Sequence, residues 1–166
     1  MKPPYHMHLS QREIDDPTVL DEILRQGRWT TLALVGGETP DDPWPYALTL
    51  SYGYAPEERA LYFHTAREGL KLEILAANPR VCGTVVDDLG YLQGKCAHAY
   101  RSVVYWGEME ILDALEDKRR AIEILLEHLE ADPAIMRQRL LDRGETYERA
   151  CILRLRIEGL TGKQGQ

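Results

Sequence analysis

The stretch LYFHTAREGLKLEILAANPRV, residues 61–81, joins two strand-like ends through a helix-like centre. The helical pattern covers Leu70–Ala77, and Pro79 ends it because proline restricts the residue before it. Four small or polar residues stand where the first strand becomes the helix: His64, Thr65, Gly69 and Lys71. The stretch therefore predicts a strand, a short helix and a second strand. The candidate binding residues lie at the junction between the first strand and the helix.

This junction has the parts of a phosphate cradle. The first N–H groups of a helix lack partners, and the helix dipole places partial positive charge there. Thr65 adds a hydroxyl donor, Lys71 and Arg67 add positive charge, and Gly69 allows close approach to the backbone. The alternative is ordinary helix capping with solvated charges, and the pattern is not a Walker A loop.

Length and charge limit the class of protein. The chain has 166 residues, the size of one domain spanning 1–166, and 44% of them are hydrophobic. The 20 basic and 27 acidic residues give a net charge of −7. This balance argues against a nucleic-acid-binding protein, which usually shows a basic surface, but it is compatible with a local basic pocket.

Membrane and metal chemistry are not expected. No apolar run approaches the roughly 20 residues of a membrane span, and the N-terminal segment lacks the apolar core of a signal peptide. We therefore expect a cytoplasmic protein. The three cysteines are Cys82, Cys96 and Cys151. Without a CxxC pair or a histidine set they predict ordinary thiols and no metal site.

The apolar patterns predict a mainly β chain with peripheral helices. Six strands are expected, at 28–35, 46–54, 60–65, 80–86, 100–112 and 151–157. Helices are expected from Pro17 to Gly27, and at 70–77, 116–131 and 133–143. Strands 46–54 and 60–65 are expected to form a hairpin, Gly107 to mark a bulge or bend, 36–45 and 87–97 to be loops, and 161–166 to fray. Strands that neighbour in sequence favour an antiparallel barrel over a βαβ array.

Four stretches together resemble a known family. They are residues 61–81, PYALTLSYGY at 45–54, YRSVVYWGEMEIL at 100–112 with the helix at 116–129, and QREI at 11–14. They resemble the pyridoxamine 5'-phosphate oxidase-like FMN-binding split barrels, and within these the group of 5-nitroimidazole resistance (Nim) proteins. The resemblance implies an antiparallel six-stranded FMN-binding split β-barrel with flanking helices, and a homodimer with FMN at the subunit interface.

The resemblance also implies which residues meet FMN. Thr65 and Lys71 match the phosphate positions, with His64 beside them at the strand end by the flavin. The strand whose backbone edge meets the flavin ring matches Leu48, Thr49, Leu50 and Ser51. Arg101 and Ser102 match positions that reach the flavin from the partner subunit.

Two departures from the family pattern lie beside the expected ring position. Thr49 stands where Nim-type strands usually carry proline, and Ser51 stands where they often carry asparagine. The loop 36–45 is also longer than the usual turn, and its Trp44 is either a lid over the flavin or an apolar plug. These departures bear on substrate choice more than on cofactor binding.

The resemblance implies an FMN-dependent reductase. Electrons would pass from NADH or NADPH through FMN to a small organic acceptor such as a nitroaromatic, with His64 as the candidate catalytic residue. The alternative is a non-catalytic flavin- or haem-binding protein or electron carrier, in which His64 could ligate haem. An oxidase acting on pyridoxamine phosphate is disfavoured because its C-terminal substrate motif is not found after Ile157.

Overall fold

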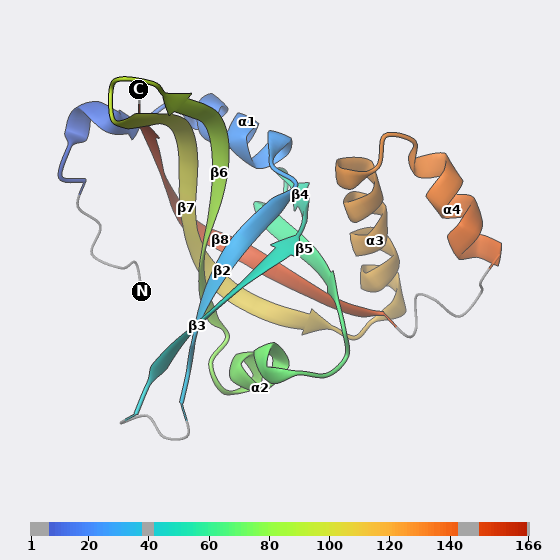
Figure 1. The fold of residues 1–166 in the computed structure, drawn as a ribbon. Helices are drawn as coiled ribbons and strands as arrows, with labels where there is room; N and C mark the ends of the chain where they lie inside the picture. The colour runs from blue at the N-terminus through green and yellow to red at the C-terminus, as the bar shows by residue number, and fades with distance from the viewer. Residues whose placement is uncertain (1–6, 38–41, 143–149, 166) are drawn as a thin grey trace.

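An antiparallel sheet of eight strands forms the body of the molecule (Figure 1). The computed structural model describes residues 7–37, 42–142 and 150–165. The strands run in the order β3-β2-β6-β7-β8-β5-β4, and β1 pairs with β8. Their bounds are β1 Glu13–Ile14, β2 Trp29–Gly36, β3 Trp44–Ser51, β4 Gly53–Ala55, β5 Ala60–Thr65, β6 Arg80–Leu92, β7 Ala97–Leu112 and β8 Cys151–Gly165.

The sheet curls into a split barrel, which confirms the predicted fold class. β3 comes close to β5, but no backbone ladder joins these two strands in the described chain, so the barrel stays open there. Short β1 and β4 are added to the six predicted strands. The main core fills the barrel with fully buried side chains such as Phe63, Leu155 and Tyr105. Burial of this apolar surface is the main stabilising contribution.

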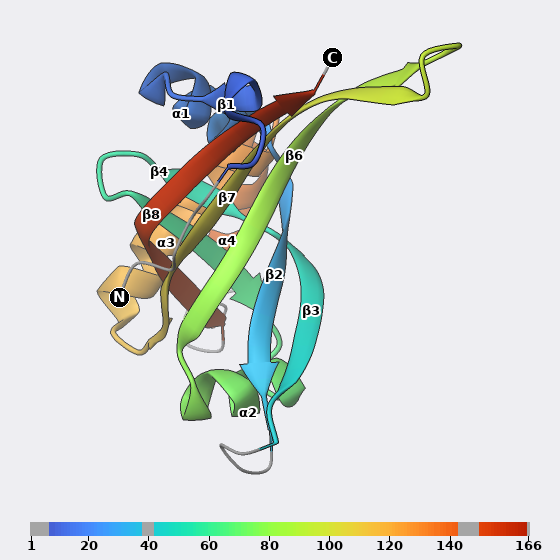
Figure 2. The ribbon, with the colours of Figure 1, turned by 90° about the vertical axis from the view of Figure 1, so that its left-hand side faces the viewer.

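Helices α1 (Pro17–Gln26) and α2 (Leu70–Ala77) lie at opposite ends of the sheet (Figures 1 and 2). α1 begins as predicted, with Pro17 at its first position and the Asp16 carboxylate accepting from the Thr18 N–H at 2.8 Å. Gly27 ends it. A single 3₁₀ turn, Ser10–Arg12, precedes β1.

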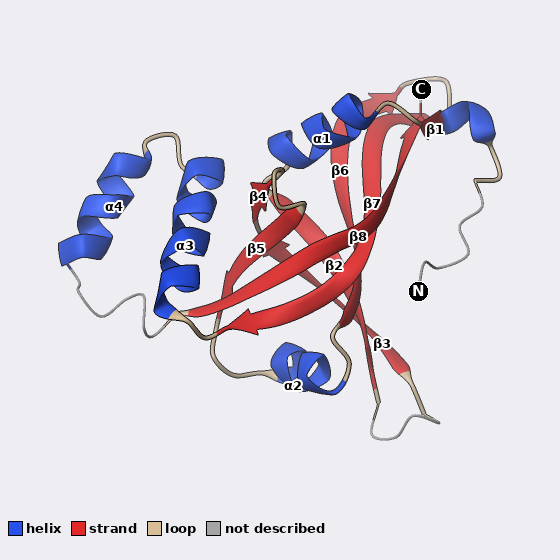
Figure 3. Ribbon diagram, turned by 180° about the vertical axis from the view of Figure 1, so that it is seen from behind, coloured by secondary structure: helices blue, strands red, loops and turns tan. Residues whose placement is uncertain are grey.

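Helix α3 (Leu115–Leu129) covers the outer face of β4 and β5, and α4 (Pro133–Asp142) packs beside it (Figure 3). Ala121, Ile122 and Leu125 of α3 form a second apolar core with Tyr62. A Cβ atom on Gly53 would stand 2.9 Å from the Leu125 Cα. This contact requires glycine, because the helix backbone cannot yield to a larger side chain.

The hairpin expected between 46–54 and 60–65 is wrong in its first half. Tyr52 interrupts the segment: its side chain is buried and its hydroxyl donates to the Leu24 carbonyl at 2.7 Å. β3 pairs instead with β2, from Trp29 opposite Ser51 to Gly36 opposite Trp44. Only the short β4 pairs with β5. The buried hydrogen bond from Tyr52 to α1 thus outweighs the local strand pattern.

The loop expected at 87–97 is also wrong. β6 continues to Leu92 and β7 begins at Ala97, so the two form a long hairpin that projects from the body (Figure 2). Its tight turn carries Gly94 and Cys96 with positive φ values of 76° and 47°. Most side chains of this hairpin are exposed, so neither of its faces needs to be apolar. The sequence therefore lacks the alternation of apolar and polar residues from which a strand is predicted.

The C-terminal tail does not fray over 161–165. β8 runs to Gly165, between β7 and β1. A Cβ atom on Gly162 would stand 2.2 Å from the Leu20 Cδ2 atom of α1. The glycine-rich sequence therefore serves close packing against α1, although locally it has the composition of a loop. Residue 166 lies outside the described residues.

Stability is expected to fall with acid because of His128. Burial lowers the pKa of His128 below its ordinary 6.5, and its Nε2 lies 2.6 Å from the Gly27 carbonyl, which ties α3 to the end of α1. The unfolded chain then binds the proton more readily, so stability is full above the unfolded pKa and is lost as pH falls through it.

We expect the free energy of unfolding, measured by urea titration, to drop between about pH 7.5 and about pH 5.5. The drop should be smaller in His128→Gln. His8→Gln, which changes an exposed histidine before β1, is the matched control and should follow the wild-type curve. An equal pH dependence in all three proteins would contradict the assignment.

Candidate functional site

The junction between β5 and α2 ends on a glycine in a conformation that other residues rarely adopt. Gly69, the residue before α2, has φ +123°, a conformation open to glycine and rarely to others. The Leu72 N–H donates to its carbonyl at 2.9 Å. Gly69 offers no side-chain acceptor, so the N–H groups of Leu70 and Lys71 are not capped by a side chain. The start of α2 is therefore open to an anion.

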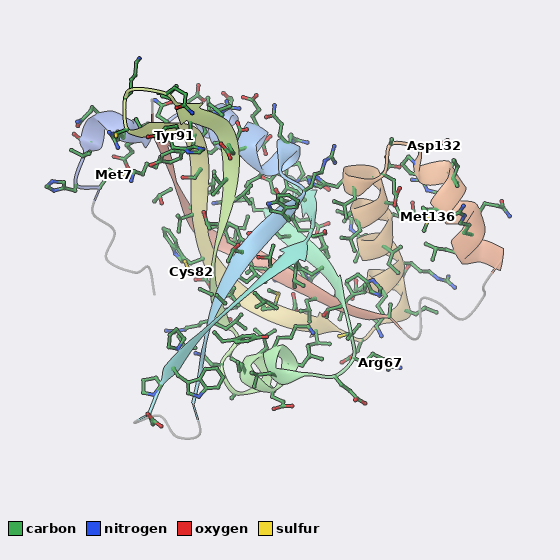
Figure 4. The ribbon with its side chains drawn as sticks, in the orientation of Figure 1. Met7, Arg67, Cys82, Tyr91, Asp132 and Met136 are labelled. Carbon is green, nitrogen blue, oxygen red and sulfur yellow. The ribbon has the colours of Figure 1, made fainter. Side chains whose placement is uncertain are left out.

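Two cations stand at this helix start. Lys71 Nζ lies 4.0 Å from the point where a Cβ atom on Gly69 would stand, so the ammonium group folds over the first turn. Arg67 is exposed on the connection between β5 and α2 (Figure 4). Neither forms an ion pair with any described carboxylate. The predicted phosphate residue Thr65 is half-buried at the end of β5, opposite Cys151 of β8.

A third cation at this end was not predicted. Lys118 of α3 is 8% exposed, and the helix containing it was expected only to pack. Burial raises the pKa of the Cys151 thiol, while the positive charges of Lys71, Lys118 and Arg67 lower it. These three cations therefore lie at the same end of the molecule as Cys151. The available signal was the spacing of Lys118, one turn before Ala121 on the apolar face of the helix.

The predicted ring-binding strand is an edge of the sheet. In β3, Leu48 and Leu50 are half-buried against the main core, whereas Thr49 and Ser51 are exposed on the outer side. Thr49 Oγ1 lies 3.2 Å from Thr31 Oγ1 of β2. Because β3 pairs only with β2, alternate residues direct their N–H and C=O groups away from the sheet. The edge can bind a flat polar group.

His64 directly precedes Thr65 in the sequence, but the two side chains point to opposite faces of β5. It is exposed and forms no hydrogen bond with the described residues. It follows Ala60 and Tyr62 along the face that α3 covers. Its imidazole is therefore available to a ligand at the α2 end of the sheet.

Arg101 and Ser102 lie at the other end of the molecule. Arg101 bonds Asp87 at 2.7 and 2.9 Å and lies 3.3 Å from Glu22 of α1. These carboxylates raise the pKa of Arg101, the hydrogen bonds that it donates to Asp87 having the largest effect. Ser102 Oγ lies 3.4 Å from the Lys163 carbonyl. Within one chain neither residue reaches Lys71, because α1 and α2 are at opposite ends (Figure 1).

A groove of about 750 Å³ lies between α2 and the ends of β2 and β3. Leu70 and Ile74 of α2 form one wall and Trp44 belongs to the other. The Trp44 ring packs over Gly36 and stands edge-on to Tyr46, with ring centroids 6.3 Å apart. Trp44 thus lines the groove as an apolar wall. The predicted loop around it includes 38–41, outside the described residues.

Over residues 7–37, 42–142 and 150–165, no three His, Cys, Asp or Glu side chains gather in a way that could hold a metal ion. In the same ranges, no helix combines the length and the apolar character needed to cross a bilayer. The described cysteines Cys82, Cys96 and Cys151 are all free thiols.

Comparison with solved structures finds this fold in several proteins. A candidate 5-nitroimidazole antibiotic resistance protein from Bacteroides thetaiotaomicron is 23% identical, with 92% of this chain and 86% of that chain covered and a TM-score of 0.69. An FAD-binding protein from Mesorhizobium loti is 23% identical over 93% and 98% of the two chains, at 0.65.

An FAD and heme binding protein from Mycobacterium smegmatis is 19% identical over 93% of this chain and 74% of that chain, at 0.69. At these identities the similarity shows a shared fold. None of the curated protein sequences matches this chain significantly. The family pattern of pyridoxamine 5'-phosphate oxidase, by contrast, matches residues 16–164. This match spans nearly the whole chain, and the protein therefore belongs to the pyridoxamine 5'-phosphate oxidase family.

Proposed function

We propose that this protein binds FMN and works as a reductase for a small organic acceptor. The observation that carries the proposal is the group of cations without ion-pair partners in the described chain, at the open start of α2. Family membership and solved structures of flavin-binding proteins with this fold support the same reading.

The residues present fit FMN. A phosphate monoester needs donors and positive charge, which Thr65, Arg67, Lys71 and the first N–H groups of α2 supply. The ring needs a flat slot with backbone groups at one side, which the free edge of β3 at Leu48–Ser51 supplies. When bound, FMN would supply the electron chemistry between NADH or NADPH and an acceptor such as a nitroaromatic.

The protein's own part is binding, orientation and proton supply. The exposed His64 imidazole is placed to hold or deliver a proton to a bound ligand. Thr49 and Ser51 point outward from the ring-binding strand and would shape the acceptor pocket. Because these positions differ from the Nim pattern, we propose that they set which acceptor is used. The cytoplasmic location expected from the sequence stays a prediction.

We further propose a homodimer. The outward side of the β3-β2-β6-β7 sheet, here called the outer face, has ten exposed residues without a charge: Trp29, Thr31, Ala33, Val35, Ala47, Thr49, Ser51, Cys82, Val86 and Val104. Figure 4 shows Cys82 in this sheet. Arg80 and Glu108 lie opposite each other at one end of this face, and the uncharged patch beside them is of the kind that another protein often covers.

A second copy on the outer face would also complete the flavin site. Arg101 and Ser102 lie far from Lys71 in one chain, so they can serve the same flavin only from the partner. Arg101 is held by Asp87 and by Glu22 of α1, on the side of β7 that faces α1, whereas Ser102 follows Val104 along the outer face. The dimer would then bring the two separated groups of predicted residues together.

One observation favours a second function. His64 is an exposed imidazole without a hydrogen-bond partner in the described residues, and such a group can ligate haem iron. One solved structure of this fold is a protein that binds both FAD and heme. The alternative is therefore a flavin- or haem-binding electron carrier without turnover of its own.

An absorption spectrum separates these functions. We expect the purified protein, loaded with FMN, to show a flavin spectrum that bleaches when NADH or NADPH is added without oxygen. Steady turnover should follow when a nitroaromatic acceptor is supplied. A flavin spectrum that persists would favour the carrier, a Soret band would favour haem, and no chromophore after FMN addition would contradict the proposal.

Removal of the Lys71 charge should weaken FMN binding. Lys71→Ala deletes a charge-assisted phosphate contact, for which we expect a loss of about 1.5–3 kcal/mol. Quenching of FMN fluorescence during titration measures the change. Lys95→Ala, in the exposed turn between β6 and β7, removes the same charge elsewhere and serves as the control. Equal affinity in wild type and Lys71→Ala would contradict the phosphate assignment.

The dimer should depend on the outer face. Val104→Asp places a charge on the β7 side of this face, opposite Thr84, and we expect monomers by light scattering together with weaker FMN binding, because burying an unpaired charge is costly. Ile135→Asp makes the same change at an exposed position of α4 and should leave the dimer intact. A monomeric wild-type protein would refute the interface.

A further inference from the structure

Lys118 is the most deeply buried cation among the described residues. Its side chain is 8% exposed, and it forms no ion pair or side-chain hydrogen bond in the described chain. Charged residues are rarely buried in this way unless a partner compensates them. Other residues of the same helix face, Ala121 and Ile122, pack into the second core. A lysine on this face therefore calls for a physical reason.

The ammonium group of Lys118 is not sealed inside the protein. No fully buried side-chain nitrogen or oxygen atom lacks a hydrogen-bond partner in the described residues. Since Lys118 makes no such bond, its nitrogen must reach accessible space while its carbon stem is buried. This is the usual behaviour of a long basic side chain at an apolar surface. The ammonium group is thus available to a ligand.

Strand register shows where Lys118 lies. β7 ends at Leu112, which pairs with Ile152 of β8, and Ile152 pairs with His64 of β5. α3 begins three residues after Leu112. The first turns of α3 therefore stand at the end of the sheet where β5 finishes and leads to α2, as Figure 1 also shows.

Three cations thus converge on one place from three segments. Arg67 comes from the connection after β5, Lys71 from α2 and Lys118 from α3. The charges of all three act on the thiol of Cys151, which lies opposite Thr65. Asp113 acts on this thiol with the opposite sign, and no described acid pairs with any of the three cations. The described acids nearest in the chain, Glu68 and Glu73, form no ion pair with these cations either. Like charges near one another and without ion-pair partners repel, which an anion would relieve.

We propose that Lys118 is a further binding residue for the flavin phosphate, and that with Lys71 and Arg67 it forms a site for a phosphate monoester dianion. This inference rests on the proposed FMN function and adds a residue to it. A monoester phosphate carries nearly two negative charges at neutral pH on one group, which matches cations that meet at a single point. Lys118 acts by charge, and it takes no part in the electron chemistry.

The test compares FMN with riboflavin, which has the same ring and no phosphate. Lys118→Met keeps most of the buried stem and removes the charge. We expect FMN affinity to fall about tenfold or more, as for loss of a charge-assisted contact, with riboflavin affinity unchanged. Lys95→Met is the control for net charge and should bind both ligands as wild type does.

Inorganic phosphate tests the site without the ring. We expect phosphate to raise the Tm of the flavin-free wild type, and to raise it less in Lys118→Met. Without any ligand, the variant should melt no lower than wild type, because repulsion among the three cations is reduced.

The outcomes separate the two proposals. Unchanged FMN affinity and an unchanged phosphate shift in Lys118→Met would overturn the role of Lys118, while wild-type FMN binding would leave the proposed function intact. A parallel loss of FMN and riboflavin, with a lower Tm, would make Lys118 a structural residue and overturn the inference. A wild type that binds phosphate through Lys118 but no flavin would support the anion site and overturn the FMN function.

Discussion

The ladder between β7 and β8 is the constraint on which the rest of the structure depends. It runs from Tyr100 opposite Gly165 to Leu112 opposite Ile152, nearly the length of both strands. A bulge at Trp106 and Gly107 interrupts its register, as the glycine in the sequence had suggested, and a Cβ atom at Gly107 would stand 1.8 Å from the Arg156 carbonyl oxygen. Bulges of this kind bend and twist a strand, and here the bend lies midway along the pair.

The two ends of this ladder carry the two halves of the proposed flavin site. One end holds Arg101 against α1, and the other end positions the start of α3 beside the end of β5. Since a ladder is stiff along its strands, the distance between these halves is set by strand length. One chain therefore does not bring these two halves together, which is the physical basis of the homodimer that we propose.

Basic side chains on the strands differ from those near the start of α2 in whether they form ion pairs. Most basic residues on the strands are paired, as Arg154 is with Glu110 at 2.5 Å, and such pairs contribute little stability at an exposed surface. Around the start of α2, cations stand without partners in the described chain. A protein with net charge −7 thus keeps a local positive site, because potential at short range depends on neighbouring groups more than on total charge.

The sequence by itself determined the elements whose signals are local. Asp16 and Gly27 marked the ends of α1, and the 61–81 stretch predicted β5, α2 and the start of β6, because caps and periodicity act within a few residues. Only the tertiary structure decided that β3 pairs with β2, that Gly162 is strand rather than frayed tail, and that Lys118 and Lys71 both lie near Cys151. Each of these depends on contacts between residues distant in the chain, where burial and register outweigh local preference.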